Sequence, residues 1–271
     1  MAYELIDHAM MLRGSCFLLG CWGVLSSLEW LADAAAWRPG GALGWDLNML
    51  RKRRLYASPL LAKLFVPTLL TLWIILRLMA AGLLLIIPVS VMMPVVLIVM
   101  LVSSTLLNLR AAADGADKMA LVVCVGALLQ SIGELSGQPM LRAAGWLWIA
   151  GQLTIAYATS GFSKIRLAPW RDGIAVRGAL SSYQYGHRFA HEILEYNVVA
   201  VTLSWAVMLI EILFPLVLFA PVEVLCAALA VLLLLHILIA VFMGLNTYPW
   251  AFAAAYPSVL LLAQGIHKLL N

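Results

Sequence analysis

The sequence predicts an all-α protein, a polytopic bundle of about eight transmembrane helices within a range of about seven to nine. First, 64% of its residues are hydrophobic and only 11% are charged, whereas a soluble domain carries about 25% charged residues. Second, the mean hydropathy is +1.00, and the apolar residues fall into runs of about 20, the length that a helix needs to cross a bilayer. We therefore expect a single integral membrane domain over residues 1–271, with the lipid bilayer as its partner.

The expected spans follow the apolar runs in order. The run 58–107 is more than twice the length of one span, so it must hold two helices, which we expect to break between Arg77 and Pro88. Each remaining run holds one helix, and these runs are 15–37, 119–135, 141–163, 197–219, 222–245 and 250–270. The longest polar connection, 164–196, is expected to be partly helical and to lie at the membrane interface.

Basic residues gather in three connections between these runs, at 38–57, 108–118 and 164–196. With eight spans, all three connections lie on one side of the membrane. The positive-inside rule makes that side cytoplasmic and puts both termini outside. The net charge of +4 therefore indicates orientation in the bilayer, and we expect no nucleic-acid partner.

Three ionisable residues in or beside the apolar runs are candidates for chemistry. At the end of a span an ammonium is poorly solvated, which favours a neutral amine and makes Lys164 a candidate base. The alternative is that Lys164 extends to the headgroups beside Trp170, an interfacial aromatic residue. Inside spans, Glu211 and His236 are costly and so often functional, and His236 suits a quinone carbonyl or a proton relay. The alternative for both is an interhelical hydrogen bond.

Other polar residues lie in the connections. Asp114 and Asp117 either cap a helix or contact lipid headgroups. His187 and His191 lie four residues apart on one helical face, a spacing that can bind a metal, although a solvated surface helix accounts for it better. We expect no metal and interpret the four cysteines, which lie in apolar runs without a metal-binding spacing, as small buried hydrophobic residues: Cys16, Cys21, Cys124 and Cys226.

Four stretches between residues 108 and 257 are informative because of the order in which they occur. They are the loop from Asn108 to Asp117, the segment Tyr157-x3-Gly161-x2-Lys164-x5-Trp170-x2-Gly173, Glu211 with Pro215, and His236 with Asn246 and Trp250. In this order they resemble the vitamin K-dependent gamma-carboxylase-like membrane domain family, also called the horizontally transferred transmembrane (HTTM) domain. The similarity is greatest to its small bacterial members, the sporulation-delaying-protein B group.

The resemblance implies a quinone-dependent membrane enzyme that acts on a peptide or a small lipophilic substrate. In the carboxylases, the lysine that matches Lys164 deprotonates a reduced quinone; O2 and CO2 are the other reactants. The resemblance further implies a location in the bacterial inner (cytoplasmic) membrane. It assigns the substrate or quinone site to Tyr157, Gly161, Trp170, Gly173, Glu211, His236 and Asn246. The alternative is a non-enzymatic membrane protein, such as a toxin maturation or immunity partner, or a transporter.

Overall fold

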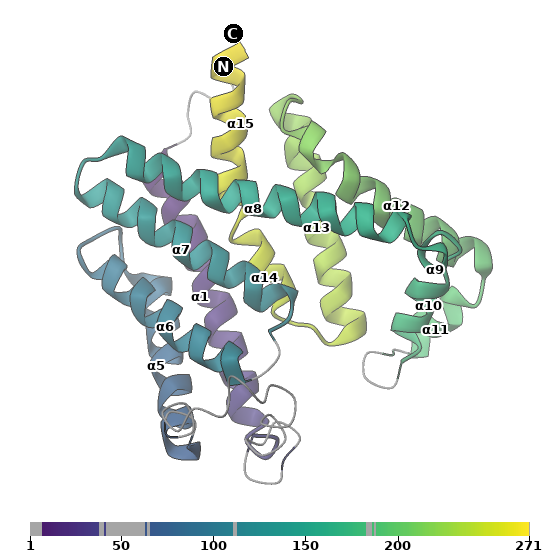
Figure 1. Cartoon of the computed structure of the whole chain (residues 1–271), viewed down its shortest axis with the longest axis horizontal. Helices are drawn as coiled ribbons and strands as arrows, with labels where there is room; N and C mark the ends of the chain where they lie inside the picture. Colours follow the sequence, from purple (N-terminus) through teal and green to yellow (C-terminus); the bar gives the residue numbers. More distant parts are fainter. Residues whose placement is uncertain are drawn as a thin grey trace.

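The computed structural model describes residues 7–37, 41, 63, 66–110, 113–182, 186 and 188–270, and within these residues the chain forms helices and no strand (Figure 1). The long helices are α1 (His8–Ala32), α5 (Pro67–Ile86), α6 (Met92–Arg110), α7 (Gly115–Leu135), α8 (Pro139–Ile165), α12 (Asn197–Val217), α13 (Val222–Met243) and α15 (Tyr256–Leu270). The short helices are α9 (Ala168–Arg171), α10 (Ile174–Leu180), α11 (Arg188–Leu194) and α14 (Tyr248–Ala253).

Seven helical segments in the described residues are long and apolar enough to cross a membrane: α1, α5, α6, α7, α12, α13, and α14 with α15 taken together. The prediction of an all-α polytopic bundle is confirmed, as is the break between Arg77 and Pro88, since α5 ends at Ile86. The predicted span 141–163 lies on α8, which is not among the seven. Polar residues such as Gln152 and Thr154 lower its mean hydropathy.

Two predicted spans differ in detail from the structure. The first helix begins at His8 rather than at residue 15, because the Asp7 carboxylate accepts a hydrogen bond from the Ala9 amide and caps the helix there. The last span is not continuous, since α14 ends at Ala253 and α15 starts at Tyr256. Pro257 lacks the amide proton that a continuous helix would need at this point.

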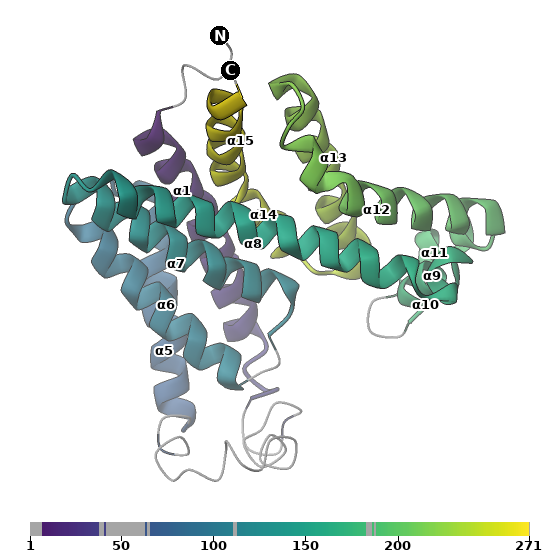
Figure 2. The same cartoon turned by 45° about the horizontal axis from the view of Figure 1, so that its top comes forward.

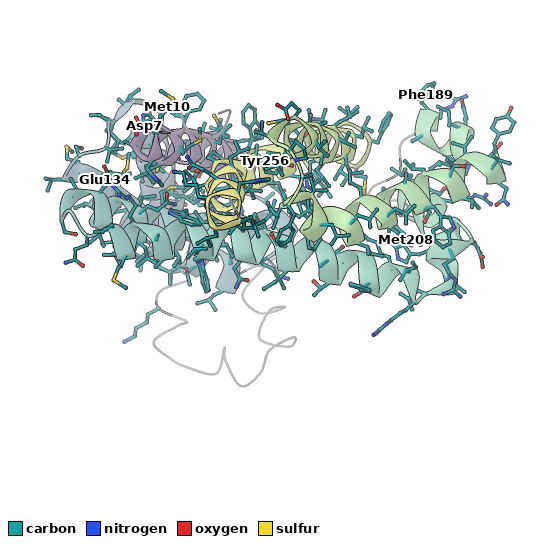
Figure 3. The ribbon with its side chains drawn as sticks, turned by 90° about the horizontal axis from the view of Figure 1, so that it is seen from above. Asp7, Met10, Glu134, Phe189, Met208 and Tyr256 are labelled. Atoms are coloured by element: carbon teal, nitrogen blue, oxygen red, sulfur yellow. The ribbon has the colours of Figure 1, made fainter. Side chains whose placement is uncertain are left out.

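The helices form two groups joined by α8. α1, α5, α6 and α7 lie on one side and α9 to α13 on the other, as both side views show (Figures 1 and 2). Seen from above, Asp7 and Glu134 lie at one side of the molecule and Phe189 of α11 lies at the other (Figure 3). α8 contacts α7 through its first half and α12 through its second half, so one helix is a wall of both groups.

Glycines allow α7 and α8 to approach very closely. A Cβ atom on Gly126 would lie 2.6 Å from the Gly145 carbonyl oxygen, and a Cβ atom on Gly145 would clash with the Gly126 carbonyl. Only glycine permits this backbone contact, and small residues at helix crossings are typical of membrane bundles. The first half of α8 is thereby fixed against α7.

Candidate functional site

One face of α8 positions the candidate base. Tyr157, Ser160 and Lys164 follow a spacing of three and four residues, so their side chains lie on one stripe of the helix. All three side chains line the same cavity. Lys164 lies in the last turn of α8, as the sequence predicts.

The Lys164 ammonium does not extend to the end of the bundle. Its Nζ atom lies 2.5 Å from Oε1 and 2.6 Å from Oε2 of Glu211. Glu211 is buried well inside α12, in a helix that is long and apolar enough to span the membrane. Nζ also lies 5.1 Å from the centre of the Trp170 ring, a cation–π contact. The structure thus brings Glu211, which is 47 positions away in the sequence, to Lys164 and Trp170.

Gly161 sets the distance between the two helices that carry this ion pair. A Cβ atom at this position would lie 2.6 Å from Cγ1 of Ile212 and 2.9 Å from its backbone nitrogen. Gly173 has a positive φ of 73° at the start of α10 and packs against the backbone of Ala200. Neither glycine lines the cavity, so the structure gives both of them a packing role.

A second polar pair joins α8 to α13. The Tyr157 hydroxyl lies 3.0 Å from Nε2 of His236, and both side chains are buried. The His236 ring stacks on Phe252 of α14 with 4.0 Å between ring centres, and Tyr248 lies beside them. The other ring nitrogen of His236, Nδ1, is buried and has no hydrogen-bond partner among the residues that the structure describes.

A cavity of about 600 Å³ connects these two pairs. Its polar lining includes Tyr157, Lys164, Glu211 and His236, which come from three different helices. Most of the remaining wall is apolar and is formed by α10, α11, α12 and α13. This size and this combination of an apolar wall with a few converging polar groups are typical of sites for small organic ligands.

Trp170 also lines this cavity, and the remaining predicted site residues that the structure describes lie outside it. Asn246 donates a hydrogen bond to Glu29 on α1 at 3.0 Å. Asp114 and Asp117 form a reciprocal capping box at the start of α7, which supports capping over headgroup contact. His191 is exposed and bonded to the Ser181 hydroxyl, and His187 lies outside the described residues. The described part of the chain holds no group of three side chains suited to a metal ion.

Sequence reasoning missed one residue of the site, Tyr248, and one buried cation far from it, Arg77. Tyr248 lines the cavity, and its hydroxyl accepts a hydrogen bond from the Gly115 amide. Its position between Asn246 and Trp250, two residues that carry the resemblance, was the available signal. Arg77, used only to place a helix break, is a fully buried cation on the other side of the molecule. The signal there was a lone charge in a long apolar run.

No protein-family model matches the chain, and the comparisons with curated proteins and with solved structures give no match.

Proposed function

We propose that this integral membrane protein binds a lipid-soluble quinone in the cavity between α8, α12 and α13, and that Lys164 accepts a proton from the reduced form. The supporting observation is the convergence of Lys164, Glu211, Tyr157 and His236 in one largely apolar cavity. We also propose that the chain is related to the carboxylase-like membrane family, since four of the residues that carry the resemblance meet there.

The residues of the cavity fit a quinone. Its apolar wall suits a ring that carries methyl and alkyl groups. When Tyr157 donates its hydroxyl proton to Nε2, the neutral His236 ring carries its proton on Nδ1, which has no hydrogen-bond partner among the described residues. Nδ1 is buried, so a shift of the ring must accompany donation of this N–H to a quinone oxygen in the cavity. At the other polar end, Lys164 and Glu211 hold exchangeable protons.

The ion pair changes how Lys164 acts as a base. The Lys164 amine lies within hydrogen-bond distance of both Glu211 carboxylate oxygens, so a proton can move directly between the two groups. The amine becomes a base when Lys164 passes a proton to Glu211, which leaves both groups neutral. The neutral amine then takes the proton of a hydroquinone hydroxyl. A bound quinone supplies the redox chemistry, and Lys164 and Glu211 supply and remove the proton.

Binding and oxygen uptake test this proposal. Wild-type protein in nanodiscs is expected to bind 2-methyl-1,4-naphthoquinone by native mass spectrometry and to catalyse oxygen consumption with its reduced form. Lys164→Arg is expected to retain the pair with Glu211 and to lose oxygen uptake by a factor of about 100 or more, because arginine stays protonated. The matched control is Lys268→Arg, at an exposed lysine in the last turn of α15. A fully active Lys164→Arg protein would contradict the proposal.

A second candidate function has an observation of its own. Both Glu211 carboxylate oxygens are bonded to Lys164, so the pair can serve as an interhelical link without chemistry. In that case the chain is a non-enzymatic membrane partner, for example in toxin maturation or immunity. It would carry only phospholipid, and Lys164→Arg would behave as wild type in every assay. The quinone experiment therefore separates the two functions.

A further inference from the structure

The wall of the cavity contains two apolar stripes that face the same space. On α12, Val199, Leu203 and Val207 follow at intervals of four residues and lead to Glu211. On α13, the stripe consists of Leu235, Leu238, Ile239 and Phe242. Residues at these intervals share one face of a helix. Each stripe is therefore a continuous apolar surface that begins beside a polar residue of the site, Glu211 on α12 and His236 on α13.

The two helices diverge after the turn that joins them. α12 packs along α8, while α13 turns away toward α14, and both views show the resulting gap between the two ribbons (Figures 1 and 2). Four large apolar side chains that line the cavity are at least 36% exposed, and three of them lie on these two helices: Val199 and Leu203 on α12 and Leu238 on α13, with Ile193 on α11 as the fourth. The cavity therefore opens between α12 and α13.

The surroundings of this opening define what can enter it. α12 and α13 are both long and apolar enough to span a membrane, so their outer surfaces meet hydrocarbon chains. The short helices α10 and α11 contribute to the cavity wall near the start of α12. There Val176, Ala190 and Leu194 are buried against it. The apolar side of the cavity thus faces the bilayer, and short amphipathic helices cover the region beyond it.

We infer that the gap between α12 and α13 is a lateral entry from the bilayer that holds the hydrocarbon chain of the ligand. This inference rests on the proposed function and names its substrate class, an amphipathic lipid with one polar ring and a long apolar chain. A cavity of about 600 Å³ suits a ligand of drug size. A longer chain must leave through the opening, along the two apolar stripes.

Two probes separate the entry from the polar site. They are 2-methyl-1,4-naphthoquinone without a chain and the same ring with an octaprenyl chain, both measured with the whole protein in nanodiscs. The variant Leu203→Trp/Leu238→Trp fills the opening. The control variant Leu209→Trp/Leu234→Trp adds the same side chains to exposed positions of α12 and α13 that do not line the cavity.

The filled opening is expected to weaken binding of the octaprenyl quinone about tenfold or more, a change of about 1.4 kcal/mol. Binding of the chainless quinone is expected to weaken much less, so that the ratio of the two dissociation constants rises about fivefold or more. The control variant should change neither. Wild-type protein that binds the chainless quinone but rejects the octaprenyl form would overturn the lateral entry and leave the proposed function standing. Equal loss of both quinones, or loss of neither, would also overturn it. If wild-type protein binds neither quinone, the proposed function itself fails and the inference falls with it.

Discussion

Two cations, the buried Arg77 on α5 and the partly buried Lys164 on α8, lie on opposite sides of the molecule, and their surroundings differ. Arg77 on α5 is 1% exposed, donates hydrogen bonds to the hydroxyls of Ser27 and Ser26 at 2.9 and 3.1 Å, and lies over the Trp22 ring. Lys164 also lies over a tryptophan ring, but its partner is a carboxylate and it lines a cavity.

The difference shows that a buried charge alone does not identify a functional site in a membrane protein. Arg77 is enclosed by side chains. Its hydrogen-bond partners are neutral hydroxyls, and no salt bridge in the described residues compensates its charge. It links α5 to α1. Lys164 has a full counter-charge and adjoins free space. Chemistry requires room for a reactant beside the charge, and only the second site provides that room.

The largest expected effect is on the ion pair. Glu211→Leu leaves a charged amine in an apolar site without its partner, and we expect it to lower the free energy of unfolding by about 4 kcal/mol. The double variant Glu211→Leu/Lys164→Met removes both charges and is expected to recover most of this loss. Unfolding of both proteins can be followed by circular dichroism during titration with sodium dodecyl sulfate. A double variant as unstable as the single one would show that the pair is not the cause.

Replacing arginine by lysine at one site and lysine by arginine at the other tests whether the surroundings of Arg77 and Lys164 differ. Arg77→Lys removes the planar fork that reaches two hydroxyls, and the loss of two charge-assisted hydrogen bonds is expected to cost about 3 kcal/mol. Lys164→Arg keeps a carboxylate partner and is expected to unfold within about 1 kcal/mol of wild type. The same titration measures both. Equal stability of the two variants would mean that the surroundings of Arg77 and Lys164 do not differ in the way described.

The next effect concerns the approach of α8 to α12. Gly161→Val places a branched side chain against the backbone of Ile212, and we expect a loss of about 2 kcal/mol from overpacking, together with weaker quinone binding. Gly151→Val is the control on the same helix, since a Cβ atom there meets nothing within 4 Å. Thermal unfolding measures the loss of stability, and native mass spectrometry measures quinone binding. Loss of stability with unchanged binding would separate the helix contact from the cavity.

The smallest effect is expected at one hydroxyl of the Arg77 site. Ser26→Ala removes one of the two acceptors and should cost about 1 kcal/mol, because Ser27 still holds the guanidinium. Ser163→Ala is the control, at an exposed hydroxyl bonded only to its own helix. A loss above about 3 kcal/mol would show that the two hydroxyls act as a single unit.

The sequence was sufficient for the fold because the bilayer acts on each segment separately. A run of apolar residues long enough to span, such as 222–245, predicts α13 without knowledge of its neighbours. The capping box at Asp114 and Asp117 is equally local, and it was foreseen as one of two alternatives. The break before Pro257 was missed because the apolar run continues through it.

The site could be predicted only as separate residues. Lys164 and Glu211 each stand out as ionisable groups at or within spans, but they are 47 positions apart. Their contact depends on how far α8 and α12 approach and on the rotation of each helix. Gly161 and the shape of the residues that face it determine the approach and the rotation of the two helices. Hydropathy contains no information on either. The cavity arises from the divergence of α12 and α13, for which the sequence offers no local signal.

Glycine contacts hold α8 at two places, where Gly145 meets Gly126 of α7 and where Gly161 meets Ile212 of α12. Lys164 lies just beyond the second contact and 19 residues, or about 28 Å, beyond the first. A tilt of about 5° at the α7–α8 crossing moves the far end of α8 by about 2 Å over that length, and α12 must move with it. The position of the amine is therefore governed in part by side chains on the opposite side of the molecule. Libraries aimed at the substrate range of this protein should include the α7–α8 crossing as well as the cavity wall.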